Sequence, residues 1–311
     1  MSIVIDCFGD SHVGRHRPAN EDQYLIADLN KSMRVHRTSL GLSHPTRLFG
    51  GSQGKLLLVA DGLGGHESGE RASTLAVDGI ANYLLNAMDW LCRANSQSED
   101  KLIAELKRAF AHSQLAVEVE ADAIPQRRGM GTTLTLGYID WPNLYVVHVG
   151  DTRCYHVRDD SLKQLTTDHT IAELSRVASN DQVGSESKQD TQVFNPMGHA
   201  LWNVVGGNDR SLEPEIIKET LEVGDSLLLC SDGLTRYVKD SELLQLIQID
   251  QPANQTCTQM IEMANQRGGK DNTTVVLARF VEQCADVESA TASAVIENSE
   301  STNLAPTQLA K

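Results

Sequence analysis

Acidic residues stand where several apolar segments of the chain end or begin. Asp61, Asp151 and Asp232 each follow an apolar run at residues 55–60, 144–149 and 226–230. The other three acids precede apolar runs and are Glu21, Asp22 and Asp271. A carboxylate at a strand end is held by a rigid element but reaches beyond the sheet. Several carboxylates together disfavour ionisation unless a cation lies between them.

Hard divalent cations meet that requirement, because Mg²⁺ and Mn²⁺ prefer carboxylate, carbonyl and water oxygens. The glycines beside these acids allow close approach of the backbone, so the carbonyl oxygen of Gly62 is a further candidate ligand. A single Asp-Gly pair is best explained as turn chemistry. Because the acids recur at the ends of apolar runs, the pattern favours a shared metal site over isolated turns.

The segments that would position these acids predict an α+β protein. Apolar runs and alternating patterns predict strands at residues 55–60, 132–139, 144–149, 153–157, 226–230 and 273–280. Residues 68–91, 99–119, 240–249 and 254–266 have the spacing of amphipathic helices, with Ser68 as N-cap of the first. Neighbouring strands without a helix between each pair favour antiparallel sheets.

Three stretches lack such patterns. Residues 31–53 and 178–192 are rich in polar residues and turn formers, and we expect exposed loops there. Residues 282–311 contain five acidic residues, one Lys and no aromatic residue, which predicts a disordered acidic tail. We therefore expect one folded domain over residues 1–281.

Composition excludes several classes of protein. The 311 residues include 27 Lys and Arg against 42 Asp and Glu, a net charge of −15, which argues against a nucleic-acid partner. The six Cys residues form no CxxC pair, so neither a zinc site nor a disulfide framework is expected. No apolar run is long enough to span a membrane, and the N-terminus lacks signal-peptide features. We expect a cytoplasmic location and a monomer.

At these acids the chain resembles the metal-dependent protein serine/threonine phosphatases of type 2C, the PPM family, in its bacterial stand-alone form. Seven motifs in the family's order carry the resemblance over about residues 8–280. They are Gly14-x-x-Arg17-x-x-Asn20-Glu21-Asp22, residues 59–66 with Gly69-Glu70, Gly131-Thr132-Thr133, residues 149–153, Leu165-Thr166-x-Asp168-His169, residues 229–234, and Lys270-Asp271-Asn272-Thr273-Thr274.

The resemblance implies a four-layer α/β/β/α sandwich whose metal centre lies at one end. It implies two Mn²⁺ or Mg²⁺ ions bridged by Asp61, with the Gly62 carbonyl on one ion and Asp232 and Asp271 on the second. A third, weaker ion would lie between Asp151 and Asp232. Glu21 and Asp22 would act nearby, and Arg17 would bind the substrate phosphate. Asp22, Asp61, Asp232, Asp271 and Arg17 are the implied catalytic residues.

The implied reaction is hydrolysis of phosphoserine and phosphothreonine in proteins by a metal-bridging water or hydroxide, without a phosphoenzyme. Leu63 stands where some members have a His that could be the general acid, and His66 is a candidate substrate-binding residue with a structural turn role as the alternative. Residues 170–195 correspond to the flap beside the site. The implied partners are phosphoproteins and a Ser/Thr kinase whose signalling it opposes.

Two other functions use the same residues. A degenerate family member could bind phosphoproteins without hydrolysing them, although all the metal acids are present. A metal-dependent hydrolase of small phosphate esters would need the same cations.

Overall fold

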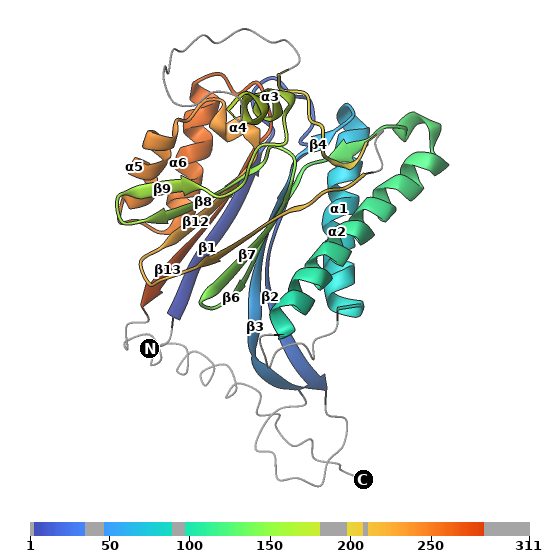
Figure 1. Cartoon of the computed structure of the whole chain (residues 1–311). Coiled ribbons are helices and arrows are strands. Elements are labelled where there is room, and N and C mark those ends of the chain that lie inside the picture. The colour runs from blue at the N-terminus through green and yellow to red at the C-terminus, as the bar shows by residue number, and fades with distance from the viewer. Residues whose placement is uncertain (1–2, 35–46, 89–96, 181–197, 208–210, 283–311) are drawn as a thin grey trace, which may run out of the picture.

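Two antiparallel sheets of five strands each lie face to face in the computed structural model, which describes residues 3–34, 47–88, 97–180, 198–207 and 211–282 (Figure 1). The first sheet has the order β1-β13-β12-β8-β9, and the second has the order β11-β7-β6-β3-β2. The strands of the first are β1 (Ile3–His12), β8 (Arg153–Arg158), β9 (Ser161–Gln164), β12 (Ser226–Cys230) and β13 (Thr273–Glu282). Those of the second are β2 (Gln23–Arg34), β3 (Arg47–Ala60), β6 (Leu134–Asp140), β7 (Asn143–Val149) and β11 (Glu215–Thr220).

Two helix pairs cover the outer faces of the sheets. Helices α1 (His66–Asn86) and α2 (Gln97–Ala123) share one apolar core with the second sheet, and α5 (Asp240–Gln248) and α6 (Ala253–Gln266) share another with the first. A third core lies between the sheets. The predicted four-layer α/β/β/α sandwich is therefore confirmed.

Burial on both faces explains why the strands read as continuous apolar runs. In β12, Leu227 and Leu229 belong to the core between the sheets, whereas Leu228 and Cys230 belong to the core under α5 and α6. Side chains alternate between the faces of a strand, so a sheet covered on both sides needs apolar residues at every position.

Strand register brings the site segments to one end of the sandwich. In the first sheet Cys230 pairs with both Arg153 and Val275. In the second, Ala60 pairs with Gln23. Five aspartates lie within four residues of one of these paired positions or of Val149, and they are Asp22, Asp61, Asp151, Asp232 and Asp271. Antiparallel pairing thus gathers residues that are up to 250 positions apart in the sequence.

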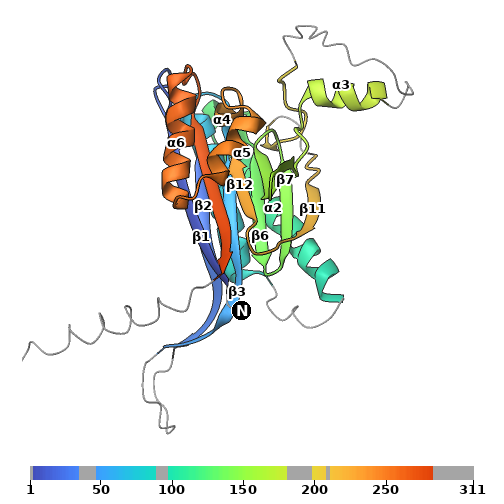
Figure 2. The ribbon, with the colours of Figure 1, turned by 90° about the vertical axis from the view of Figure 1, so that its left-hand side faces the viewer.

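Three short elements lie around this end. The small sheet β10-β5-β4 consists of β10 (Val205–Gly206), β5 (Gly131–Thr132) and β4 (Gly62–Leu63). Helix α4 (Asp232–Thr235) follows β12, and the 3-10 helix η1 (Pro125–Arg127) follows α2. Helix α3 (Ile171–Asn180) stands away from the sheets, as Figure 2 shows.

The two five-stranded sheets contain four strands that are not among those predicted from the sequence, namely β1, β2, β9 and β11, and the structure differs from the predictions at further places. Residues 31–34 and 47–53, predicted as loop, continue β2 and β3, with Ser32 opposite Phe49. Residues 35–46 of that predicted insert lie outside the described residues, as do the acidic tail from residue 283 and residues 181–197 of the predicted flap. The described part of that flap contains α3, although residues 178–180 had been read as loop. The N-cap of α1 is Gly65, because the helix begins two residues before Ser68.

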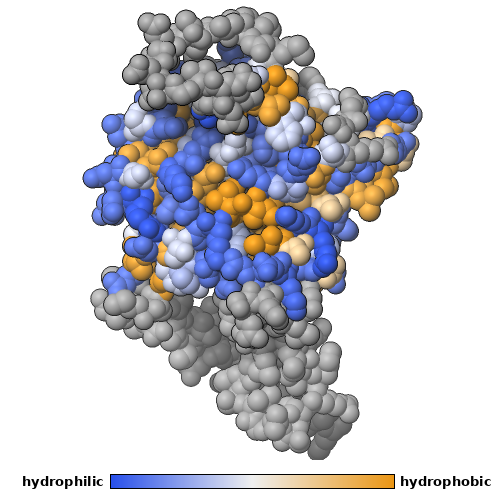
Figure 3. All heavy atoms as spheres, viewed as in Figure 1, coloured by the Kyte–Doolittle hydropathy of each residue, from blue (hydrophilic) through white to orange (hydrophobic). Residues whose placement is uncertain are grey.

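The surface seen in Figure 3 is mostly hydrophilic, with apolar residues in separate patches. No helix among the described residues is long and apolar enough to cross a membrane. Cys154, Cys230 and Cys257 are buried and form no disulfide, as is common for small core residues.

Candidate metal and phosphate site

A cleft of about 370 Å³ opens at the end of the sandwich where the acidic segments meet. The predicted site residues that line it come from both sheets and from the loop after β1; they are Arg17, Glu21, Asp61, Gly62, Asp151, Asp232 and Asp271. Asp22 is not among the lining residues and lies beneath the cleft, with 3% of the residue exposed. Strand ends and a loop that are remote in sequence therefore place seven of the predicted residues around one cavity.

The Gly131-Thr132-Thr133 motif holds the backbone of Asp61. The carbonyl oxygen of Asp61 accepts hydrogen bonds from the Thr132 hydroxyl at 2.8 Å and from the Thr133 amide at 2.9 Å. The Asp61 amide donates to the Thr133 hydroxyl at 2.9 Å. Because Ala60 is fully buried at the end of β3, these bonds fix the point at which Asp61 leaves the sheet.

Asp22 is held by two hydroxyl groups of the first sheet. Its Oδ2 accepts hydrogen bonds from Ser231 at 2.8 Å and from Thr274 at 2.7 Å. Ser231 also accepts a hydrogen bond from the Thr274 amide at 2.9 Å, so the two strands and Asp22 form one connected network. The other carboxylate oxygen of Asp22, Oδ1, is buried and has no hydrogen-bond partner among the described residues.

Asn272 anchors the loop that carries Arg17 and Glu21. Its Oδ1 accepts a hydrogen bond from the Glu21 amide at 2.9 Å, and its Nδ2 donates to the carbonyl oxygens of Val13 and Ala19. The neighbouring residue Asp271 reaches the cleft. One motif before β13 therefore both supplies an acid and fixes the loop after β1.

His169 anchors the turn that carries Asp151. The amide of His169 donates to the Gly150 carbonyl at 2.7 Å, and the Gly150 amide donates to Nδ1 of His169 at 3.2 Å. His148, His169 and Glu215 come close enough to resemble a metal cluster. However, Nε2 of His148 contacts two carbonyl oxygens and its Nδ1 contacts the Thr135 hydroxyl, so His148 offers no free nitrogen. We assign this group to positioning the Gly150 turn.

The aspartates perturb one another strongly. Burial, followed by neighbouring aspartates, raises the pKa of Asp22 and of Asp151 to about 7. The same causes raise the pKa of Asp61 well above its usual range, and burial raises that of Asp232 although Arg236 opposes it. Without a cation the ionised set is therefore unfavourable at neutral pH.

Glycines allow the backbone to pack closely beside the cleft. A Cβ on Gly62 would collide with the carbonyl of Gly69 and would lie 2.8 Å from that of Glu21. A Cβ on Gly69 would collide with the Glu21 carboxylate. The glycines of the second motif thus let the start of α1 approach Glu21.

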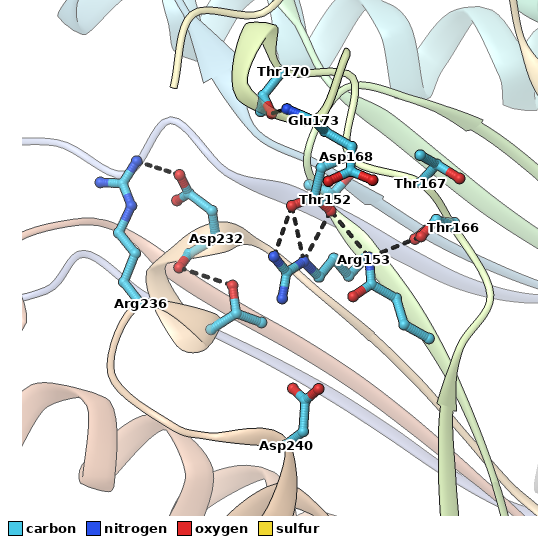
Figure 4. Close-up of polar contacts among 12 residues, drawn as sticks. Thr152, Arg153, Thr166, Thr167, Asp168, Thr170, Glu173, Asp232, Arg236 and Asp240 are labelled. Carbon is cyan, nitrogen blue, oxygen red and sulfur yellow. Dashed lines mark hydrogen bonds and ion pairs between the residues drawn. The ribbon is translucent and has the colours of Figure 1, made fainter. Parts of the chain in front are cut away.

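Three arginines near the cleft have different partners. Nη2 of Arg17 lies 2.8 Å from Oδ1 of Asp271, and 42% of the Arg17 side chain is exposed. Arg236 contacts both Asp232 and Asp271. Figure 4 shows Arg236 directed toward Asp232, whereas Arg153 is held by Asp168. Arg17 therefore lies at the cleft with part of its side chain exposed, and Arg153 is committed to a structural ion pair.

The residues present fit a divalent-cation site. Oδ1 of Asp22 and Oδ1 of Asp232 are both buried without a hydrogen-bond partner among the described residues. Buried polar atoms in folded proteins are normally satisfied. Carboxylate oxygens that accept no hydrogen bond, grouped with other carboxylates, are suitable ligands for Mg²⁺ or Mn²⁺.

The acidic residues of this cleft were predicted from the sequence, but Arg236 was not. Its position four residues after Asp232 was the available signal, because residues i and i+4 of a helical turn are neighbours. The roles of Ser231 and Asn272 could be predicted only as motif members. His66 is the first residue of α1, and its side chain lies outside what the structure describes. Its predicted role in substrate binding stays a prediction.

Comparison with known proteins agrees with this geometry. The sequence profile of the family described as protein phosphatase 2C matches residues 46–281. Serine/threonine protein phosphatase PstP of Mycobacterium tuberculosis is 32% identical over 228 residues, which cover 73% of this chain and 41% of PstP. The chain thus spans less than half the length of that relative. Protein phosphatase PhpP of Streptococcus pneumoniae is 31% identical over 238 residues, 74% of this chain and 88% of PhpP.

A solved structure of the PstP catalytic domain in complex with two manganese ions superposes with a TM-score of 0.65. It is 28% identical and covers 90% of this chain and all of that chain. The profile match extends over more than half of the sequence, and the fold and cleft are consistent with it. The chain belongs to the protein phosphatase 2C family.

Proposed function

We propose that the chain is a metal-dependent protein phosphatase that hydrolyses phosphoserine and phosphothreonine. The observation that carries this proposal is the convergence of five aspartates and Glu21 on one end of the sandwich, where two buried carboxylate oxygens have no hydrogen-bond partner among the described residues. The manganese-bound PstP domain supports the choice of metal. Names of the relatives support proteins as the substrate class.

The cations would be Mn²⁺ or Mg²⁺, two in number, with a third weaker position near Asp151. We assign Asp61 and the Gly62 carbonyl to one ion and Asp61, Asp232 and Asp271 to the other, with Glu21 and Asp22 beside them. When bound, two such ions would lower the pKa of a water molecule and neutralise charge on the phosphate.

The chain's own residues hold the substrate and the ions. Arg17 is 42% exposed at the cleft, and its guanidinium can donate two parallel hydrogen bonds to phosphate oxygens. Ser231 and Thr274 keep Asp22 oriented beneath the cleft through its Oδ2. The cysteines need no part in this direct hydrolysis, and burial raises the pKa of Cys230 to about 12, so its thiol stays protonated.

The wider role we propose is to oppose a Ser/Thr kinase by acting on its phosphorylated substrates. Such a role requires that the cleft accept a phosphorylated side chain, and Arg17 lies among the residues that line it.

The test is phosphate release from a phosphothreonine peptide in the presence and absence of Mn²⁺. We expect Mn²⁺-dependent release that Asp61→Asn and Asp232→Asn each reduce by about 100- to 1,000-fold, comparable to losses when groups that stabilise a transition state are removed. Asp28→Asn, at an exposed acid paired with Lys55, is the control and should retain activity.

Three results would refute parts of the proposal. Full activity in excess chelator would contradict the metal mechanism. Hydrolysis of small phosphate esters without action on any phosphoprotein would favour a small-ester hydrolase. Tight binding of the phosphopeptide without turnover would favour a phosphoprotein-binding role.

A further inference from the structure

Arg236 is a cation placed among the carboxylates that we assign to metal. It follows α4, and its Nη1 donates to Oδ2 of Asp271 at 2.8 Å while its Nη2 contacts Oδ2 of Asp232. One guanidinium therefore joins an acid at the end of β12 to an acid at the start of β13.

Asp271 has both of its oxygens engaged by arginines. Oδ1 contacts Arg17 and Oδ2 contacts Arg236. Asp232 differs, because Oδ2 contacts Arg236 whereas Oδ1 is buried and has no hydrogen-bond partner among the described residues. A cation that binds both acids therefore competes with at least one guanidinium at Asp271.

A guanidinium and a divalent ion compete for these oxygens. Mg²⁺ requires carboxylate oxygens at about 2.0–2.1 Å in near-ideal geometry. Arg236 lies against the same oxygens with a permanent positive charge, since a guanidinium is not deprotonated in proteins. Arg17 is the residue assigned to phosphate, so Arg236 is the one without another role.

There is space for Arg236 to move aside. Its side chain is 46% exposed and also lines a second cavity of about 380 Å³ between α3 and α4. That cavity includes Thr170, Glu173 and His199. Rotation of the Arg236 side chain into it would free Asp232 and Asp271 without a change of fold.

We propose that Arg236 is an internal counter-cation for Asp232 and Asp271 that a divalent ion displaces, so that it lowers the affinity of one of the two metal positions. This inference rests on the proposed metal site. It makes Arg236 stabilising in the metal-free protein and unfavourable to metal binding, whereas a purely structural arginine would stabilise both states.

The first test is calorimetric titration of the full chain with Mn²⁺ at pH 7.5 after chelator removal. We expect Arg236→Gln to tighten one Mn²⁺ dissociation constant about tenfold, which corresponds to about 1.4 kcal/mol. Arg176→Gln is the matched control, because Arg176 lines the second cavity but pairs with Glu173. It removes the same charge and should change affinity less than about threefold, the limit expected for an exposed pair.

The second test is thermal unfolding with chelator and with saturating Mn²⁺. We expect Arg236→Gln to melt below the wild type in chelator and to gain more than the wild type when Mn²⁺ is added. If Arg236→Gln does not fold, Arg236→Lys replaces it, because an ammonium keeps the charge but cannot present the planar fork. Its Mn²⁺ affinity should also exceed that of the wild type.

Equal or weaker Mn²⁺ binding by the Arg236 variants would overturn the inference, as would equal tightening in Arg176→Gln. Failure of the proposed metal site gives a different result, because then the wild-type chain itself would bind no Mn²⁺. Failure of the phosphatase activity alone would leave Mn²⁺ binding in place and would appear only in the peptide assay.

Discussion

Asp22→Asn provides a quantitative test of the repulsion within the acidic site. Asp22 is 3% exposed, and burial together with Asp232 and Asp271 raises its pKa from an ordinary value of 3.8 to about 7. Asn keeps an oxygen that can accept the hydrogen bonds from Ser231 and Thr274 but carries no charge. We therefore expect the metal-free variant to be more stable than the wild type at alkaline pH.

The sign and size of this change in stability follow from proton linkage. The folded state keeps the Asp22 proton up to about pH 7, whereas the unfolded chain loses it near pH 3.8, so wild-type stability falls as pH rises across that interval. One pKa unit is worth about 1.4 kcal/mol, so ionisation costs the folded state about 4 kcal/mol at pH 8 and about 2 kcal/mol at pH 5. The amide hydrogens of Asn that find no partner cost about 1–3 kcal/mol at either pH.

The assay is urea unfolding with chelator at pH 8 and pH 5. The gain in free energy of unfolding from Asp22→Asn should be about 2–3 kcal/mol larger at pH 8 than at pH 5, and the constant cost of the amide cancels in this comparison. Asp28→Asn is the control, because Asp28 is an exposed acid paired with Lys55 and its removal should change stability by less than about 0.5 kcal/mol at both values. A gain that does not depend on pH, or a loss that is larger at pH 8, would refute the electrostatic argument.

Three further outcomes are expected. Gly69→Ala should improve the intrinsic helix propensity of α1 by up to about 1 kcal/mol, yet it should weaken Mn²⁺ binding because the new methyl group collides with the Glu21 carboxylate; unchanged calorimetric affinity would contradict this. Arg17→Lys should lower kcat/KM on a phosphothreonine peptide by about 10- to 100-fold, the value of one hydrogen bond to a charged group, and a loss below twofold would remove Arg17 from phosphate binding. Mn²⁺ affinity should weaken as pH falls from 8 to 6, because protons compete for Asp22 and Asp151, whose pKa values lie near 7; affinity that is constant over this range in calorimetry would show that neither acid holds the metal.

Much of the architecture was predictable from pattern. The apolar runs around Leu58 and Leu228 predicted strands, and the spacing of Ile80 and Phe110 predicted helices, because burial on one or two faces imposes a period on the sequence. Helix α3 was missed although its apolar residues recur at helical spacing, and Leu174 and Val177 on it are exposed. The strands at residues 47–53 were also missed, because Gly50, Gly51 and Gly54 there read as loop formers.

The sequence by itself identified the candidate residues for chemistry. Asp61, Asp151 and Asp232 could be identified because they recur after apolar runs, whereas Glu21, Asp22 and Asp271 precede such runs. The ordered motifs added Arg17.

The tertiary structure decided how these residues meet. Strand register brought both sheets' acids to one cleft, placed Asp22 beneath it, and set Arg236 against Asp232 and Asp271. Among these contacts only the one between Asp232 and Arg236 joins residues close in sequence. The physical reason is that the electrostatic energy of a pair of charges depends on their distance and burial. The order of charges along the chain specifies neither quantity, and antiparallel strand pairing fixes both.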